Sequence, residues 1–462
     1  MSLRNKYKEK KLLFGLYLCV ILILLVSFYV QRATLFLPWH NDEWRHATLA
    51  QQFLDGDWSA LFHMEAGFII FVAFWLLLVP LSGYFIVTLT CIVLAGIGLW
   101  KLFDDKRISI VALCLYGALP SNAKLLGILY GVPMSLGVSL LILALVTLRA
   151  RTVTWKYVLV LVATCFVHPP TAIVVGILGL IVYRSKRILA VGILFGAALL
   201  YVAHFKFGYT IQSLLFFGDT DINSISMFNI FFLCGIPLLI FSILAIYVIK
   251  FNKVAHAKSF IVLVWLALIT SCNALLYIFF KFSILVPAER NYYLLMVATI
   301  LLGSIGIIFA GVKLNTLLSK IRLRASFFVV VLCVLFIVGF CYYDNQFIEF
   351  KTVSQMVKQN EFDALSVLRA QPQAPVLSYE LLNNVMYLGA GQRPLYLRVW
   401  EEGNRDAVLS YFNADTCAKK EEIIRSLGAE YVVNRKPETC SFLAELSTDG
   451  LFIYKVKDTA LS

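Results

Sequence analysis

Long apolar runs alternate with short basic segments over the first three quarters of the chain. A helix needs about 20 apolar residues to cross the hydrocarbon core of a bilayer, fewer where the bilayer is thin and more where the helix is tilted. The runs predict spans at about 12–30, 84–100, 108–119, 129–148, 156–167, 170–183, 188–206, 227–250, 259–281, 290–312 and 325–343. The pattern therefore predicts a polytopic α-helical membrane protein with about eleven crossings.

Two places in this pattern need a separate interpretation. The run 67–80 is short for a span and is broken from the next run at Pro80–Gly83, so we expect it to lie along the outer face or to re-enter. Two other short runs meet at His168-Pro169-Pro170, where proline ends or starts a helix. We predict a hairpin with its tip outside, and a substrate contact of His168 is the alternative use of that tip.

The residues after 343 have a different pattern, with mixed charges, turns and short apolar runs. Helical periodicity predicts helices at 354–370, 380–388 and 419–427, and short β-rich runs predict strands at 375–379, 394–398 and 430–433. Strands that alternate with helices are typical of an α/β domain. We predict a transmembrane module at 1–343, with a first outer loop at 31–83, and a small C-terminal α/β domain at 344–462.

Composition agrees with a membrane protein, because 60% of the residues are hydrophobic, 15% are charged and the mean hydropathy is +0.83. The net charge of +13 arises from basic clusters in the short loops, so it is not evidence for a nucleic-acid partner. Such loops stay in the cytoplasm. The N-terminus is then cytoplasmic, the C-terminal domain lies outside, and the first run is a retained helix in a plasma (inner) membrane.

The most distinctive polar segment, 40–46, follows the first span directly. Asp42 or Glu43 would take a proton from an acceptor hydroxyl, and Arg45 would bind a phosphate. The alternative interpretation is a solvated loop beside the membrane.

Acid placement distinguishes the function classes. None of the predicted spans has a carboxylate at its centre, whereas ion- and proton-coupled transporters usually need one there. Acids and a few cations, among them Lys124 and Arg290, gather instead at the predicted outer face. This arrangement favours chemistry on a lipid-linked phosphate over transport.

The first outer loop resembles that of the GT-C superfamily of integral-membrane glycosyltransferases. The matching residues are Asp42-Glu43-x-Arg45, then Ala47-x-x-Ala50, then Leu54-x-Gly56-x-Trp58. The branch of protein O-mannosyltransferases and lipid A aminoarabinose transferases is the most similar. The resemblance implies an inverting transfer from a polyprenyl-phosphate sugar, with Asp42 as general base and Glu43 orienting the acceptor or tuning Asp42.

The chain departs from that branch where relatives often carry Lys-Pro-Pro, because residues 62–67 read Phe-His-Met-Glu-Ala-Gly. We expect Arg45, Arg290 and Lys124 to bind the donor phosphate, with His63 as another substitute for the missing lysine. Residues with a predicted substrate contact are Trp44, His46, His63, Glu65, His168 and Tyr292. For Arg290 and Trp44, the alternative is an interfacial anchor.

A second departure concerns metal ions. The predicted second outer loop, 120–124, has no carboxylate, although the oligosaccharyltransferase branch carries an acidic pair there. Asp219 and Asp221 would be the carboxylates for a divalent cation, and an acidic surface loop is the other interpretation. We predict no metal site and no required cofactor.

Cys417 and Cys440 are the only cysteines after residue 343, and an outer, oxidising compartment favours a disulfide between them. The complete prediction is a transferase whose partners are a polyprenyl-phosphate sugar donor, a glycan, lipid or protein acceptor, and the bilayer, with no nucleic acid. The alternative is a non-catalytic flippase, polymerase partner or transporter of envelope glycan assembly.

Overall fold

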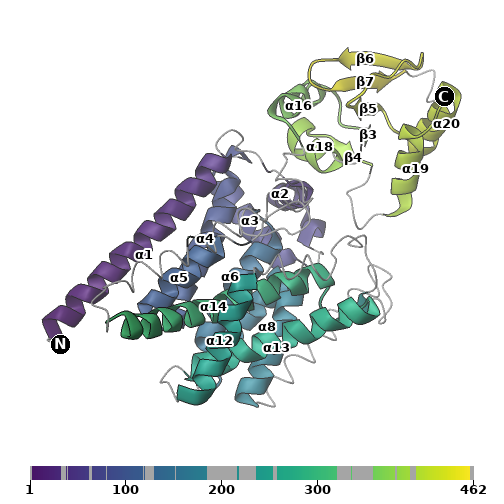
Figure 1. The fold of residues 1–462 in the computed structure, drawn as a ribbon. Helices are drawn as coiled ribbons and strands as arrows, with labels where there is room; N and C mark the ends of the chain where they lie inside the picture. The colour runs from purple at the N-terminus through teal and green to yellow at the C-terminus, as the bar shows by residue number, and fades with distance from the viewer. Residues whose placement is uncertain are drawn as a thin grey trace. The chain divides into compact units, whose positions relative to one another are not determined.

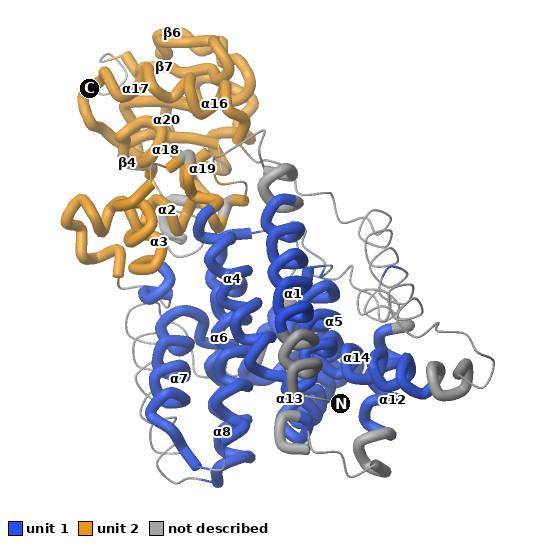
Figure 2. The backbone as a smooth tube through the Cα atoms, turned by 90° about the vertical axis from the view of Figure 1, so that its left-hand side faces the viewer, with its two compact units in different colours: residues 1–33, 64–68, 86–353 blue, residues 34–63, 69–85, 354–462 orange. Residues whose placement is uncertain are grey.

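The computed structural model divides the chain into two compact units, each with residues from distant parts of the sequence. Unit 1 comprises 1–33, 64–68 and 86–353, and unit 2 comprises 34–63, 69–85 and 354–462 (Figure 2). The structure describes residues 3–32, 38, 40–61, 65–79, 81–117, 119, 130–150, 152–184, 216–217, 236–252, 257–319, 335, 357–379, 382–395 and 402–457.

Unit 1 is a bundle of helices (Figure 1). Its long or apolar helices are α1 (Leu3–Arg32), α4 (Phe85–Leu102), α5 (Lys106–Gly117), α6 (Pro133–Thr147), α7 (Trp155–Val167), α8 (Pro169–Tyr183), α12 (Ile236–Asn252), α13 (Ala257–Phe280) and α14 (Ala288–Ser319). Two short strands, β1 (Phe216–Phe217) and β2 (Ser283–Ile284), pair antiparallel. Each of these helices overlaps a predicted apolar run, because hydropathy is read directly from the local sequence.

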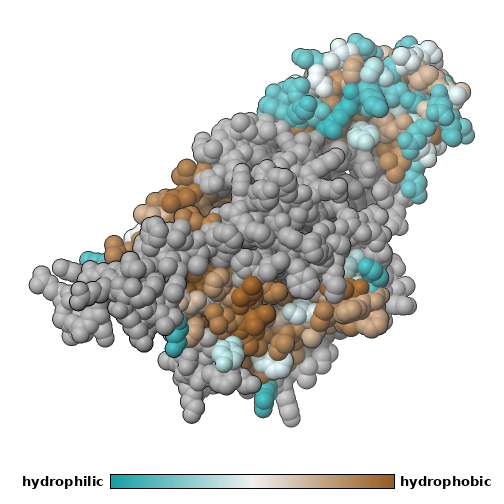
Figure 3. Space-filling view, viewed as in Figure 1, coloured by the Kyte–Doolittle hydropathy of each residue, from teal (hydrophilic) through white to brown (hydrophobic). Residues whose placement is uncertain are grey.

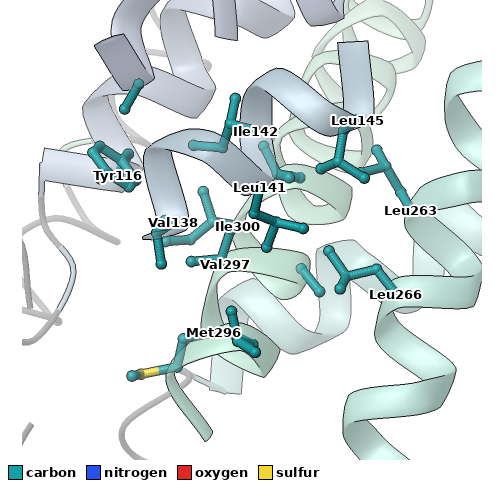
Figure 4. Close-up of a cluster of buried hydrophobic side chains, with 14 of the residues drawn as sticks. Tyr116, Val138, Leu141, Ile142, Leu145, Leu263, Leu266, Met296, Val297 and Ile300 are labelled. Atoms are coloured by element: carbon teal, nitrogen blue, oxygen red, sulfur yellow. The ribbon is translucent and has the colours of Figure 1, made fainter. Parts of the chain in front are cut away.

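A large cluster of buried apolar side chains forms the core of unit 1 (Figure 4). Leu141 and Ile142 of α6 and Val297 and Ile300 of α14 all belong to this cluster, and all four are buried. Close helix contacts depend on glycine, since a Cβ at Gly306 of α14 would lie 2.0 Å from the Phe241 carbonyl oxygen of α12. Small residues of this kind let membrane helices approach each other.

Three of the described helical segments are long and apolar enough to cross a membrane: Phe85–Leu102, Phe260–Phe280 and Arg290–Lys313. Shorter apolar helices accompany them, and Leu12, Ile23 and Phe280 are among the exposed apolar side chains of unit 1. Figure 3 shows apolar patches on the surface of the molecule. These features are those of a helical membrane protein. The predicted spans at 188–206 and 325–343 lie outside the described residues, apart from Leu335.

Unit 2 combines part of the first loop with the C-terminal residues. The loop supplies α2 (Asn41–Leu54), η1 (Trp58–Leu61), most of α3 (Ala66–Leu78) and η2 (Leu81–Gly83). The C-terminal part supplies α16 (Gln359–Ala364), α17 (Ser366–Arg369), β3 (Pro375–Ser378), α18 (Asn383–Ala390), β4 (Arg393–Pro394), α19 (Glu402–Phe412), α20 (Cys417–Leu427), β5 (Tyr431–Asn434), β6 (Leu443–Ser447) and β7 (Phe452–Val456).

The five C-terminal strands form one sheet in the order β4-β3-β5-β7-β6. β3 is parallel to β4 and β5, whereas β7 is antiparallel to β5 and β6. Successive strand residues point to opposite faces. Val376, Tyr431 and Val433 therefore pack with α16, α17 and α18 on one face, while Leu377 and Val432 pack with α19 and α20 on the other.

The tail differs in detail from its sequence prediction. α19, β6 and β7 were not expected, and the single helix at 354–370 is two short helices, α16 and α17, where 357–370 is described. The boundary expected at residue 343 lies outside the described residues. The pattern of the tail is harder to read because its elements are short and half-buried.

Candidate functional site

The predicted acidic pair lies in the first turn of α2, where His40 is the N-cap residue. His40 Nδ1 accepts a hydrogen bond from the Asp42 amide at 3.1 Å, and Glu43 Oε2 accepts one from the His40 amide at 3.2 Å. These reciprocal bonds form a capping box, which satisfies two amides that a helix otherwise leaves without a partner. The capping box therefore fixes the start of the helix that carries Asp42.

The two acids have different surroundings. Glu43 is fully buried, and its carboxylate caps the helix. The Asp42 side chain is 30% exposed, and its Oδ2 lies 3.7 Å from His40 Nδ1. Because Nδ1 accepts the Asp42 amide, this contact is not an ion pair while His40 is neutral. Asp42 is thus the carboxylate of the pair that remains accessible to a reacting group.

The next three predicted site residues, Trp44, Arg45 and His46, are buried in unit 2. Trp44 is fully buried and stacks on Phe362, with ring centroids 5.4 Å apart. The ring is therefore a core residue of unit 2, a packing that the sequence does not indicate. His46 Nδ1 donates to the Asp42 carbonyl oxygen at 2.6 Å, because a carbonyl oxygen only accepts.

A second polar group lies in unit 1 at the turn between α7 and α8. His168 caps α8, and its Nδ1 accepts from the Thr171 amide at 3.3 Å and from Thr171 Oγ1 at 2.8 Å. A Cβ at Gly137 of α6 would lie 2.9 Å from His168 Cβ, so the glycine makes room for the imidazole. With Nδ1 engaged as acceptor, the neutral ring carries its proton on Nε2.

Electrostatic interactions join His168 with two other predicted site residues of unit 1. Burial, and then the Arg290 guanidinium, lower the pKa of the His168 imidazole to about 3, against a smaller opposing effect of the Glu65 carboxylate. The imidazole is therefore neutral over the physiological range. Arg290 lies in the first turn of α14, where the helix dipole also favours an anion. Unit 1 thus brings together Glu65, His168 and Arg290.

The other predicted contacts have mixed outcomes. Tyr292 is buried, its ring lies edge-on to Tyr277, and its hydroxyl has no hydrogen-bond partner among the described residues. Lys124 and His63 lie outside the described residues, as do Asp219 and Asp221.

The described acids near Asp42 fit a metal site poorly. Glu43 already uses its carboxylate on the His40 amide, and nowhere in the described part of the chain do three His, Cys, Asp or Glu side chains form a group that could hold an ion.

Sequence reasoning did not identify the residues that hold α2. His40 is part of the predicted segment 40–46 without a role of its own, and Thr48 and Tyr387 are not among the predicted residues. A helix-start signal was present, since an acidic residue follows His40 three positions later. The partners of Thr48 and Tyr387 are far away in the sequence and give no local signal.

The tail also contains a disulfide between Cys417 and Cys440, with Cα atoms 5.4 Å apart. It joins the first residue of α20 to the segment that precedes β6.

Several solved membrane-enzyme structures share the fold. The archaeal oligosaccharyltransferase AglB from Archaeoglobus fulgidus, in complex with an inhibitory peptide and a dolichol-phosphate, is 13% identical, with a TM-score of 0.56 over 94% of this chain and 70% of that one. ArnT from Cupriavidus metallidurans is 12% identical in the apo state, with a TM-score of 0.56 over 97% of this chain and 99% of that one. Its complex with undecaprenyl phosphate gives a TM-score of 0.54 at the same identity and coverage.

No protein-family model matches the sequence, and no curated protein matches it either. The structural likeness therefore establishes the fold: the chain has the fold of GT-C membrane glycosyltransferases, as the resemblance in its first loop implies.

Proposed function

We propose that this protein is an inverting glycosyltransferase that moves a sugar from a polyprenyl-phosphate donor to an acceptor at the outer face of the membrane. The observation that carries the proposal is the position of Asp42. Its partly exposed carboxylate lies in the first turn of the helix that follows α1, in a chain with the GT-C fold. ArnT binds undecaprenyl phosphate and AglB binds a dolichol-phosphate, which supports a lipid phosphate as the donor carrier.

In the proposed reaction, Asp42 takes the proton of an acceptor hydroxyl or amine. The acceptor atom bonds to the anomeric carbon from the face opposite the leaving group, the bond from that carbon to the phosphate oxygen breaks, and the lipid phosphate leaves with the electron pair.

Charge then develops on the departing phosphate, and cations stabilise it. We assign this role to Arg290, at the N-terminal turn of α14, and to Arg45, with Lys124 as a third candidate. The neutral His168 offers its Nε2–H as a hydrogen-bond donor to a phosphate or sugar oxygen. A phosphate leaving group needs less acid assistance than a sugar alkoxide, so cations replace a protonated carboxyl.

The test is substitution of the proposed base. Purified protein is incubated with radiolabelled undecaprenyl-phosphate mannose, glucose or aminoarabinose and with total membranes as a source of acceptor, and the loss of label from the lipid-phosphate fraction is measured. Asp42→Asn should bind undecaprenyl phosphate normally and transfer sugar about a hundredfold to ten-thousandfold more slowly. Arg290→Ala should weaken undecaprenyl phosphate binding as well, because a charge-assisted contact is lost.

Asp57→Asn serves as a matched control, because this exposed acid of the same loop accepts a hydrogen bond from the Ser59 amide at 2.9 Å and has no proposed role in the chemistry. Near-normal transfer by a well-folded Asp42→Asn would overturn the assignment of the base. A wild-type protein that binds undecaprenyl phosphate but transfers none of these sugars would favour the non-catalytic flippase or scaffold.

A further inference from the structure

The helix that carries Asp42 is packed into the C-terminal domain, and the first of three contacts is Trp44. Its ring stacks on Phe362 of α16 with an angle of 29° between the ring planes. Around it, Val385 and Met386 of α18 belong to the same buried cluster as Val376 and Val433 of the sheet. A residue of the first loop is therefore a core residue of the tail domain.

The second contact is a buried hydrogen bond. Thr48 Oγ1 donates to the Asn384 carbonyl oxygen of α18 at 2.6 Å, and the two residues are 336 positions apart in the chain. Thr48 is fully buried. A buried hydroxyl without a hydrogen-bond partner is destabilising, so this bond favours one register of α2 against α18.

The third contact lies at the other end of α2. Tyr387 donates its hydroxyl to Asp55 Oδ2 at 2.6 Å, while Gln51 donates to Asp55 Oδ1 at 2.9 Å. Burial and the Asp55 carboxylate raise the pKa of the Tyr387 phenol to about 12, so the phenol remains a donor at every physiological pH.

These contacts share one side of α2. Residues 44, 48, 51 and 55 follow the spacing i, i+4, i+7 and i+11, which keeps side chains on a single helix face. At about 100° per residue, Asp42 lies about 150° around the helix from that face. The face that holds α2 to the tail is thus separate from the position of the proposed base.

We propose that the C-terminal domain is the positioning element for the proposed base: it holds α2 through Trp44, Thr48 and Asp55 and so sets the orientation of Asp42. This inference rests on the proposed function, because it assigns a role to Asp42. The three residues are positioning residues, since none of them needs to touch a substrate. The domain then contributes to transfer without supplying a reacting group.

The experiment uses the full chain and removes the hydrogen bonds without removing volume. Thr48→Val, Tyr387→Phe and the double variant are compared with matched controls: Thr90→Val, whose hydroxyl bonds only within its own helix, and the exposed Tyr379→Phe. The double variant should lower kcat at least tenfold while its Kd for undecaprenyl phosphate stays within twofold of wild type. Thr48→Ser should keep a higher kcat than Thr48→Val, because serine keeps the hydroxyl that donates to Asn384. Both control variants should match wild type.

Hydrogen exchange supplies a measurement that does not depend on activity. The amides of 44–54 should exchange faster in the double variant, while those of α14 should not change. The inference is overturned if wild type transfers sugar and Asp42→Asn does not, yet the double variant keeps normal kcat or normal protection of α2. If Asp42→Asn itself remains active, the proposed function has failed, and unchanged protection of α2 would then separately overturn the docking.

Discussion

A buried histidine whose Nδ1 accepts hydrogen bonds is held in one protonation state and one tautomer. His168 is in this position, because Thr171 occupies Nδ1 and the neighbouring Arg290 disfavours a second positive charge. A second proton would both break the cap of α8 and place a cation in a buried site. His168 is therefore a fixed donor at Nε2 rather than a group that titrates near pH 6.5.

This state makes folding stability depend on pH in a defined window. The unfolded chain binds a proton at His168 below about pH 6.5, whereas the folded chain binds it only near pH 3. The contribution of His168 to the free energy of unfolding should therefore be constant above pH 6.5. It should fall as the pH drops from 6.5 towards 3, by up to about 1.4 kcal/mol per pH unit.

His168→Asn tests that dependence, because asparagine still caps a helix but does not titrate. Between pH 7 and pH 4.5, the Tm of the purified variant should fall less than that of wild type, as followed by thermal unfolding in detergent. Parallel curves for the two proteins would contradict the neutral state of His168.

Single residues also mark the limit of sequence reasoning. His168 was recognised as a hairpin tip because the two prolines after it give a local signal. Trp44 was assigned to the interface or to a substrate, whereas it packs in the tail core against Phe362. No periodicity of the first loop reveals a partner so distant in the chain, so one sequence gives no sign of this packing.

At the scale of elements, the capping box decides how Glu43 should be interpreted. Asp42 and Glu43 are both candidates for the general base, and the sequence alone does not distinguish them. In the structure the Glu43 carboxylate accepts the His40 amide inside a buried site, next to the positive end of the helix dipole. The Glu43 carboxylate thus holds the first turn of α2 in place, and this turn carries Asp42.

The matched pair Glu43→Gln and Glu43→Ala separates a capping role from a chemical one. Glutamine also accepts the amide in a capping box, so Glu43→Gln should retain at least a third of wild-type transfer. Glu43→Ala should lose about 1 kcal/mol of stability and transfer more slowly, because the turn that carries Asp42 is no longer held. A drop of more than a hundredfold in well-folded Glu43→Gln would mean that the charge itself takes part in the reaction.

The helices of unit 1 were predictable because each contains a long apolar run that basic, proline or glycine residues interrupt. α4 and α8 deviate from the predicted bounds by no more than two residues at either end. β6 and β7 were missed because each has only five residues and their burial follows no strict alternation. Their pairing with β5 depends on contacts across the sheet, which a local pattern does not contain.

At the scale of the whole molecule, chain order and spatial grouping differ. Unit 2 takes 34–63 and 69–85 from the first loop and joins them to 354–462. The sequence separates a transmembrane module from a tail at a change in composition, and composition carries no information about which loop packs with the tail. The grouping makes the proposed base and the C-terminal domain one structural unit, which is why a change in the tail is expected to alter transfer.

Membrane topology is the remaining prediction at this scale. The basic loop at 101–107 should be cytoplasmic, and α2 and the tail, which share one unit, should both lie outside. In a background in which the eight other cysteines are alanine and the Cys417–Cys440 bond is kept, an impermeant maleimide should label Asp449→Cys and Ser121→Cys on intact cells. Arg107→Cys should be labelled only after permeabilisation.

Labelling of Arg107→Cys with protection of Ser121→Cys would show that 67–80 crosses the membrane. Protection of Asp449→Cys would place the tail inside, where neither a stable disulfide nor transfer at the outer face is expected.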